Sequence, residues 1–148
     1  MKQFLFYTDD NLVGIILRVT IGLIMFPHGA QKMFGLFGGY GFKATTAFLT
    51  QTVGLPWLIA VLIILVEAVG SLCLIAGFGS RLWAVLLFAV MIGAISTTCY
   101  ANGFFMNWSG NQKGEGFEYH LLVIGLCMAV FVSGSGRYSL DQLFRLGA

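Results

Sequence analysis

The chain has 148 residues, of which 58% are hydrophobic and only 9% are charged. A soluble domain of this length needs a charged surface that this composition cannot supply, which excludes the soluble enzyme classes. The net charge of +2 comes without a basic patch, so no nucleic-acid partner is expected.

Four apolar runs are each long enough to cross a bilayer, which takes about 20 residues of helix. They cover residues 11–34, 56–78, 81–101 and 117–134. We therefore predict an all-α, polytopic integral membrane protein. Its four transmembrane helices are expected to form one bundle and a single domain over residues 1–148, in contact with the lipid bilayer.

The first run gathers its polar residues and glycines on one side. At about 100° per residue, the side chains within about 40° of Arg18 are those of Asn11, Gly14, Gly22, Met25, Gly29 and Lys32. His28 lies at the edge of this stripe, and the opposite side is Val, Leu and Ile. The stripe predicts a helix whose polar face turns inward, because glycines let neighbouring helices approach closely.

A long, glycine-rich connection with a predicted helix over residues 42–51 leads to the second run, where Glu67 lies among small residues. At about 1.5 Å per residue, Glu67 and Arg18 lie at similar depths on antiparallel helices. A charge in lipid needs a partner, so we predict an intramembrane ion pair between Arg18 and Glu67. The pair either locks two helices or takes part in a proton path.

The turn GFGSR, residues 77–81, predicts a tight hairpin between the second and third runs. Four spans then place both long connections on the same side of the membrane. Ser96 and Tyr100 lie one helical turn apart and run towards that side. Three single cysteines without a C-x-x-C motif count against a thiol–disulfide oxidoreductase.

Glu118 and His120 open the fourth run and are about 200° apart on a helix, so they face different ways. Small residues share the side of Glu118, which predicts that Glu118 faces the bundle and His120 faces outward. His28 and His120 are then poorly placed to ligate one haem. We expect neither a metal site nor an intrinsic cofactor.

Four residues near the side with the long connections are predicted to converge at the mouth of the bundle: His28, Lys32, Tyr100 and Glu118. A lysine, an imidazole, a phenol and a carboxylate together form a candidate substrate or quinone pocket, with loop aromatics as a lid. In the alternative interpretation, Lys32 only reaches the interface beside an aromatic belt.

Basic residues give a weak indication of orientation. Four of them lie on the side of the termini (Lys2, Arg81, Arg137 and Arg145) and three on the other (Lys32, Lys43 and Lys113). The excess predicts cytoplasmic termini. Ser139 and Gln142 form a capping-box pattern that predicts a short C-terminal amphipathic helix along the membrane surface.

The order of these features resembles the DoxX family of small bacterial inner-membrane proteins. The pattern is R-x₉-H-G-x-x-K, a mid-span Glu before G-x₆-G, an Arg and a Glu opening the last two spans, then G-x-G-x-x-S-x-D. It corresponds here to Arg18, His28, Gly29, Lys32, Glu67, Gly70, Gly77, Arg81, Glu118, Gly134, Gly136, Ser139 and Asp141. The resemblance implies a multi-pass protein of the bacterial plasma membrane, linked to quinol oxidase or thiosulfate:quinone oxidoreductase systems.

Two functions remain open at this point. The first is a membrane subunit that interacts with quinone or quinol in an oxidoreductase system, where a bound quinone is the only expected cofactor. The second is a non-enzymatic anchor or assembly partner for a redox enzyme, with glycine-lined faces that pack helices or copies of the chain. Passage of a small amphipathic solute is a third and weaker hypothesis, because no inverted repeat supports it.

Overall fold

The computed structural model of the protein describes residue 8 and residues 10–146, with no side-chain description for residues 145 and 146. Every regular element in these ranges is helical. The α-helices are α2 (Leu12–Phe34), α3 (Gly41–Ala47), α4 (Trp57–Leu65), α5 (Ser71–Ala76), α6 (Ser80–Ala94), α7 (Glu118–Ser133) and α8 (Leu140–Leu146). The π-helices are η1 (Phe48–Thr52), η2 (Val66–Gly70) and η3 (Ile95–Cys99), and η4 (Tyr100–Asn102) is a 3₁₀-helix. The all-α prediction is confirmed.

Three continuous helices are long and apolar enough to cross a membrane: Leu12–Phe34, Trp57–Ala76 and Ser80–Asn102. The fourth predicted span, α7, is apolar but has only 16 residues. At about 1.5 Å per residue α7 measures roughly 24 Å, somewhat less than a hydrocarbon core of about 30 Å. A helix of this length is accommodated by local thinning of the bilayer.

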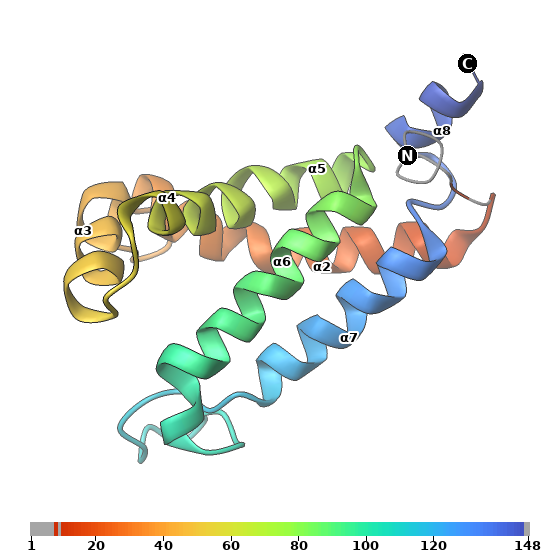
Figure 1. Ribbon diagram of the computed structural model, residues 1–148. Helices are drawn as coiled ribbons and strands as arrows, with labels where there is room; N and C mark the ends of the chain where they lie inside the picture. Colours follow the sequence, from red (N-terminus) through yellow and green to blue (C-terminus); the bar gives the residue numbers. More distant parts are fainter. Residues whose placement is uncertain (1–7, 9, 147–148) are drawn as a thin grey trace.

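The four spans pack as two pairs that splay apart. One pair is α2 with the α4–η2–α5 helix, and the other is α6 with α7. Figure 1 shows the pairs meeting at the end that carries both termini and diverging towards their other ends. The two long connections consequently lie at separate corners of the molecule. The single bundle mouth expected from the sequence is therefore wrong, because the helices converge at one end only.

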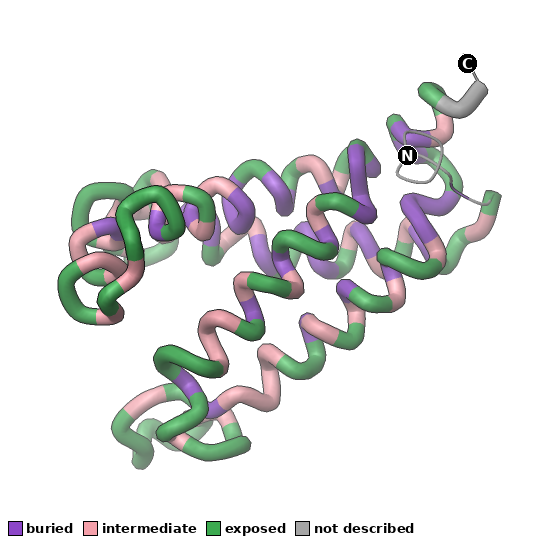
Figure 2. Tube along the Cα trace, in the orientation of Figure 1, coloured by how far each residue is buried: buried purple, intermediate pink, exposed green. Residues whose placement is uncertain are grey.

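The apolar core lies where the two pairs cross. It contains residues from every span, including Ile21, Leu74, Leu87, Met91 and Val130. In Figure 2 the buried positions concentrate along the facing sides of the pairs, whereas most of the outer surface is exposed. That exposed surface is largely apolar, as expected for helices that contact lipid.

The glycine stripe on α2 is where the helices approach most closely, which confirms the predicted inward face. A Cβ added to Gly14 would lie 2.6 Å from the backbone of Gly136, and one on Gly22 would lie 2.7 Å from the Ser71 carbonyl oxygen. At Gly29 the added atom would lie 2.4 Å from the backbone of Ala68. These contacts bring α2 against η2, α5 and the segment after α7.

Two of the membrane-spanning helices contain a π-helical turn. In the second span η2 holds Glu67, and in the third span η3 ends at Cys99. A π-turn adds one residue to an α-helix and occurs often at functional positions, because it changes which side chains face a neighbour. The side chains beside both turns are therefore candidates for a functional role.

The hairpin between the second and third spans agrees with the sequence prediction, and the C-terminal capping box agrees in part. The hairpin between α5 and α6 turns at Gly77 and Gly79, both with positive φ. In the tail, the Gln142 N–H donates to Ser139 Oγ at 3.2 Å, but the Gln142 side chain accepts from the Tyr138 N–H. Lys2 and the side chain of Arg145 lie outside the described residues, and the orientation in the membrane stays a prediction.

Candidate functional site

Lys32 and Glu67 form an ion pair between α2 and η2. The Glu67 side chain is 3% exposed and that of Lys32 is 32% exposed. Side chains on a helix lean towards its N-terminus, so Lys32 extends back to the level of Gly29, where α2 touches the backbone of residues 67 and 68. The close Gly29 contact thus places the lysine beside the carboxylate.

The predicted ion pair between Arg18 and Glu67 is wrong, because Arg18 is satisfied by carbonyl groups. Its Nε donates to the Ser135 carbonyl at 2.8 Å and its Nη2 to the Tyr138 carbonyl at 2.7 Å. Further N–H groups reach the carbonyls of Leu74, Ile75 and Arg137. The end of α5 leaves carbonyls without helical partners, and the buried guanidinium supplies their donors.

Other charged residues at the same end of the molecule also cap helices. Arg81 donates to the carbonyls of Phe131 and Val132 at the end of α7. Asp141 accepts from the N–H groups of Gly79 and Ser80 at the start of α6, at 2.7 and 3.2 Å. These contacts hold the start of α6, the end of α7 and the start of α8 together.

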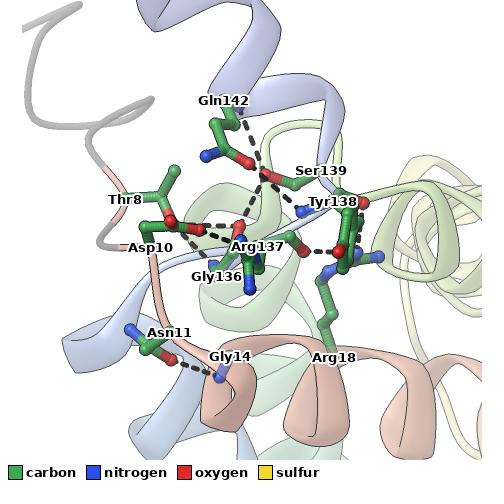
Figure 3. A network of polar contacts seen from close by, with 10 residues as sticks. All are labelled: Thr8, Asp10, Asn11, Gly14, Arg18, Gly136, Arg137, Tyr138, Ser139 and Gln142. Carbon is green, nitrogen blue, oxygen red and sulfur yellow. Dashed lines mark hydrogen bonds and ion pairs between the residues drawn. The ribbon is translucent and has the colours of Figure 1, made fainter.

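The capping network extends to the chain before α2. Figure 3 shows Thr8, Asn11 and Arg18 reaching towards the segment after α7 or capping α2. The Thr8 hydroxyl accepts from the Gly136 N–H at 2.5 Å. The polar residues at the end that carries both termini therefore stabilise the fold. The polar residues around Lys32 remain as candidates for function.

Two aromatic rings extend the Lys32–Glu67 pair towards α7. The His28 ring on α2 lies 5.9 Å from the Tyr119 ring, centroid to centroid. The Tyr119 hydroxyl donates to Met25 Sδ at 3.3 Å, and a thioether is a weak acceptor. A better acceptor placed beside this phenol would take over its hydrogen bond.

Tyr119 was missed in the sequence analysis, although a signal for it exists. Tyr119, Val123, Leu126 and Val130 recur at the i, i+4, i+7 and i+11 positions of a buried helix face. Extending this stripe backwards from the core of α7 identifies Tyr119 as its polar member at the start of the helix.

The predicted directions of Glu118 and His120 are wrong. Glu118 Oε1 accepts from the Met106 N–H at 2.8 Å and from Trp108 Nε1 at 3.1 Å, so its carboxylate faces the connection before α7. His120 faces η3 in the third span instead of lipid, with Nε2 at 3.6 Å from Cys99 Sγ. Because Glu118 is the first residue of α7, its charge is solvated by loop donors at the helix start.

Tyr100 also lies away from Lys32. Its ring stacks on Phe117 at a centroid distance of 6.2 Å, and the residue is 72% exposed. The four residues of the predicted pocket are therefore divided. His28 and Lys32 lie on α2, whereas Tyr100 lies in η4 and Glu118 at the start of α7, on either side of the connection that joins the other helix pair.

Replacing Glu118 with glutamine is expected to loosen this connection without unfolding the spans. The carboxylate accepts two hydrogen bonds from residues 106 and 108, and charge-assisted bonds contribute about 1.5–3 kcal/mol each. Hydrogen–deuterium exchange at the Met106 amide should become at least about tenfold faster. Glu115→Gln, which affects the Asn107 amide, is the matched control, and unchanged exchange at Met106 in Glu118→Gln would contradict the assignment.

An apolar groove of about 290 Å³ lies between α6 and α7. Its lining residues are Ala84, Val85, Phe88, Cys127, Met128, Phe131 and Val132. At about 100° per residue, the groove side of α7 lies roughly opposite Tyr119. The groove is therefore separate from the polar residues that face α2.

We give the name buried polar site to the buried carboxylate of Glu67 and its neighbours Lys32, His28 and Tyr119, of which His28 is exposed and the other two are half-buried. It joins a cationic donor and an imidazole on α2, a carboxylate acceptor on η2 and a phenol on α7. Among the described residues, no group of three or more His, Cys, Asp or Glu side chains is arranged to hold a metal ion. The site can hydrogen-bond the polar part of an apolar molecule and exchange protons with it.

Comparisons with known proteins agree with the membrane-spanning fold. A protein-family model described as DoxX matches residues 14–106. A Bacillus subtilis protein named "Putative oxidoreductase CatD" is 32% identical over 127 residues, which cover 86% of this chain and 83% of that protein. The Escherichia coli "Inner membrane protein YphA" is 24% identical over 145 residues, or 96% of this chain and 97% of that protein. No solved structure matches the chain significantly.

Proposed function

The chain belongs to the DoxX family, and from this premise we propose that it is an inner-membrane component of a bacterial redox system that binds quinone or quinol at the buried polar site. The name of the Bacillus relative supports the redox association, and that of the Escherichia relative supports the inner membrane. The proposal differs from the sequence hypothesis in its residues, since Glu67 and Tyr119 take the places of Glu118 and Tyr100.

The observation that carries the proposal is the Lys32–Glu67 ion pair between membrane-spanning helices. An ionisable residue near the middle of a span, as Glu67 is, is costly, and such residues commonly mark substrate or proton pathways. Here the pair also has a weakly bonded phenol nearby, on Tyr119. This arrangement supports a ligand that is itself apolar and carries a few oxygen atoms.

The roles of the side chains follow from their donors and acceptors. Lys32 has three N–H donors and needs only some of them for Glu67, so it can donate to one ring oxygen. Tyr119 can transfer its hydrogen bond from Met25 to a ring oxygen, and Glu67 can take or return a proton. Reduction of a quinone to a quinol consumes two electrons and two protons, and we assign the electrons to a partner enzyme.

Binding of a quinone to purified protein tests the proposal directly. We expect organic extracts of the native protein to contain quinone in stoichiometric amount, detected by mass spectrometry. Lys32→Met should lower the retained amount by about tenfold or more, because a hydrogen bond to a charged group contributes about 1.5–3 kcal/mol. Lys43→Met removes the same charge from an exposed position on α3 and should retain the quinone.

Two results would contradict the proposal: wild-type protein without quinone, also after incubation with excess quinone, or equal retention by wild type and Lys32→Met. The apolar groove between α6 and α7 favours a second candidate in that case. A groove on paired membrane helices suits a transmembrane helix of a partner, so the chain would act as an anchor for a redox enzyme. Co-purification with such an enzyme despite Lys32→Met would support that function.

A further inference from the structure

His120 carries the one buried side-chain polar atom without a hydrogen-bond partner among the described residues, its Nδ1. The other ring nitrogen, Nε2, lies 3.6 Å from Cys99 Sγ, which is a weak partner in either direction. A neutral imidazole always has one N–H and one bare nitrogen. Whichever tautomer forms, a polar group is left unpaired, and water normally fills such a position.

The ring of His120 continues the row of side chains that begins at Lys32. The centroids of His120 and Tyr119 are 5.6 Å apart, and those of Tyr119 and His28 are 5.9 Å apart. Lys32, Glu67 and His28 also lie within electrostatic range of His120. Of the titratable groups around His120, Cys99 from η3 and Tyr119 from α7 contact its ring, and His28 and Lys32 from α2 and Glu67 from η2 lie farther away.

We propose that His120 is the residue through which the buried polar site exchanges protons with the membrane face that carries the connection before α7, by way of water bound at Nδ1. His120 lies within the first turn of α7, close to that connection, whereas Glu67 lies near the middle of the second span. The proposed route from His120 to Glu67 passes the rings of Tyr119 and His28, with bound water completing its hydrogen bonds. The inference rests on the proposed function only for its ligand, because the proton route does not require a bound quinone.

The chain is well suited to a spectroscopic test because it contains only two histidines. Protein labelled with ¹⁵N-histidine is titrated with pH in detergent, and His28→Phe and His120→Phe assign the ring signals. In Glu67→Gln the titration midpoint of His120 should fall, because a neighbouring negative charge is lost. In Lys32→Met it should rise, because a neighbouring positive charge is lost, so the two variants should shift the midpoint in opposite directions.

Two charge-matched controls separate coupling from general effects of net charge. Asp10→Asn and Lys43→Met change exposed groups and should leave the His120 midpoint unchanged. A loosened fold cannot move the midpoint in opposite directions, so the opposite signs exclude a merely structural effect. An unchanged midpoint in both Glu67→Gln and Lys32→Met would overturn the inference.

A second readout tests the water at Nδ1. The ring N–H of His120 should exchange with solvent as fast as that of His28, which is exposed. Exchange of the His120 proton at least about tenfold slower than that of His28 would overturn the hydrated path. Absence of bound quinone in the extraction experiment would overturn the proposed function but leave these proton measurements valid.

Discussion

Replacing Gly29 with alanine is expected to destabilise the protein by about 3 kcal/mol or more. A Cβ at this position would lie 2.4 Å from the Cα and N atoms of Ala68 and from the carbonyl carbon of Glu67. These are backbone atoms of a packed helix, so no side-chain rotation relieves the overlap. Carbon atoms normally stay about 3.5–4.0 Å apart, so α2 and η2 must separate by about 1 Å.

The separation should also break the Lys32–Glu67 ion pair, because both partners sit beside this contact. Unfolding of the purified variant in detergent, followed by tryptophan fluorescence, measures the loss. Gly125→Ala and Gly93→Ala are matched controls, since an added Cβ meets nothing within 4 Å at either position. The controls should be neutral or more stable by about 0.5–1 kcal/mol, and a Gly29→Ala variant equal to them would show that the two helices do not touch here.

Replacing Arg18 with leucine is expected to cost about 3–5 kcal/mol of stability. The guanidinium serves five carbonyl groups at once, and the residue is only 2% exposed. Leucine fills part of the space but leaves the carbonyls of Ser135 and Tyr138, among others, without donors. Unpaired buried carbonyls carry a full desolvation penalty of about 1–3 kcal/mol each, reduced where the backbone can relax.

Arg137→Leu is the comparison that isolates this effect. Its side chain is exposed and forms a surface ion pair with Asp10 at 3.2 Å, a type of contact that contributes about 0–1 kcal/mol. The same detergent unfolding assay should therefore find a small loss for Arg137→Leu and a large one for Arg18→Leu. Similar losses in the two variants would mean that Arg18 does not hold the tail against α5.

The helices and the inward face of α2 could be predicted from the sequence because both depend on local periodicity. Apolar length determines the spans, and the spacing of Gly14, Gly22 and Gly29 determines one helix face. The turn at Gly77 and Gly79 followed from its glycines. Each of these inferences needs only neighbours along one helix or one turn.

The partner of Glu67 could not be predicted in the same way. Arg18 and Lys32 share a face of α2, so periodicity allows either of them to meet the carboxylate. The choice depends on where α5 ends, since carbonyls at its end accept from Arg18 and Glu67 is left to Lys32. When the residue that caps a helix end lies on another helix, the pairing depends on the tertiary structure and cannot be read from local sequence.

The divergence of the two helix pairs could not be predicted from the sequence either. Sequence indicates that both long connections lie on one side of the membrane, but it does not give the crossing angle of the helices. The predicted convergence of Tyr100 and Glu118 with Lys32 assumed parallel helices, and the structure separates them at that end. His28 and Lys32 were identified because they are polar residues within a span.

The π-helical turn at residues 66–70 has a consequence for how this chain tolerates length changes. Deleting one residue there would restore an ordinary helix and rotate everything after it by about 100° relative to everything before it. Ala68 and Ser71 could then no longer both meet the glycines of α2. Among related sequences, a one-residue gap at this point would mark members that have lost the buried carboxylate or moved it to another helix.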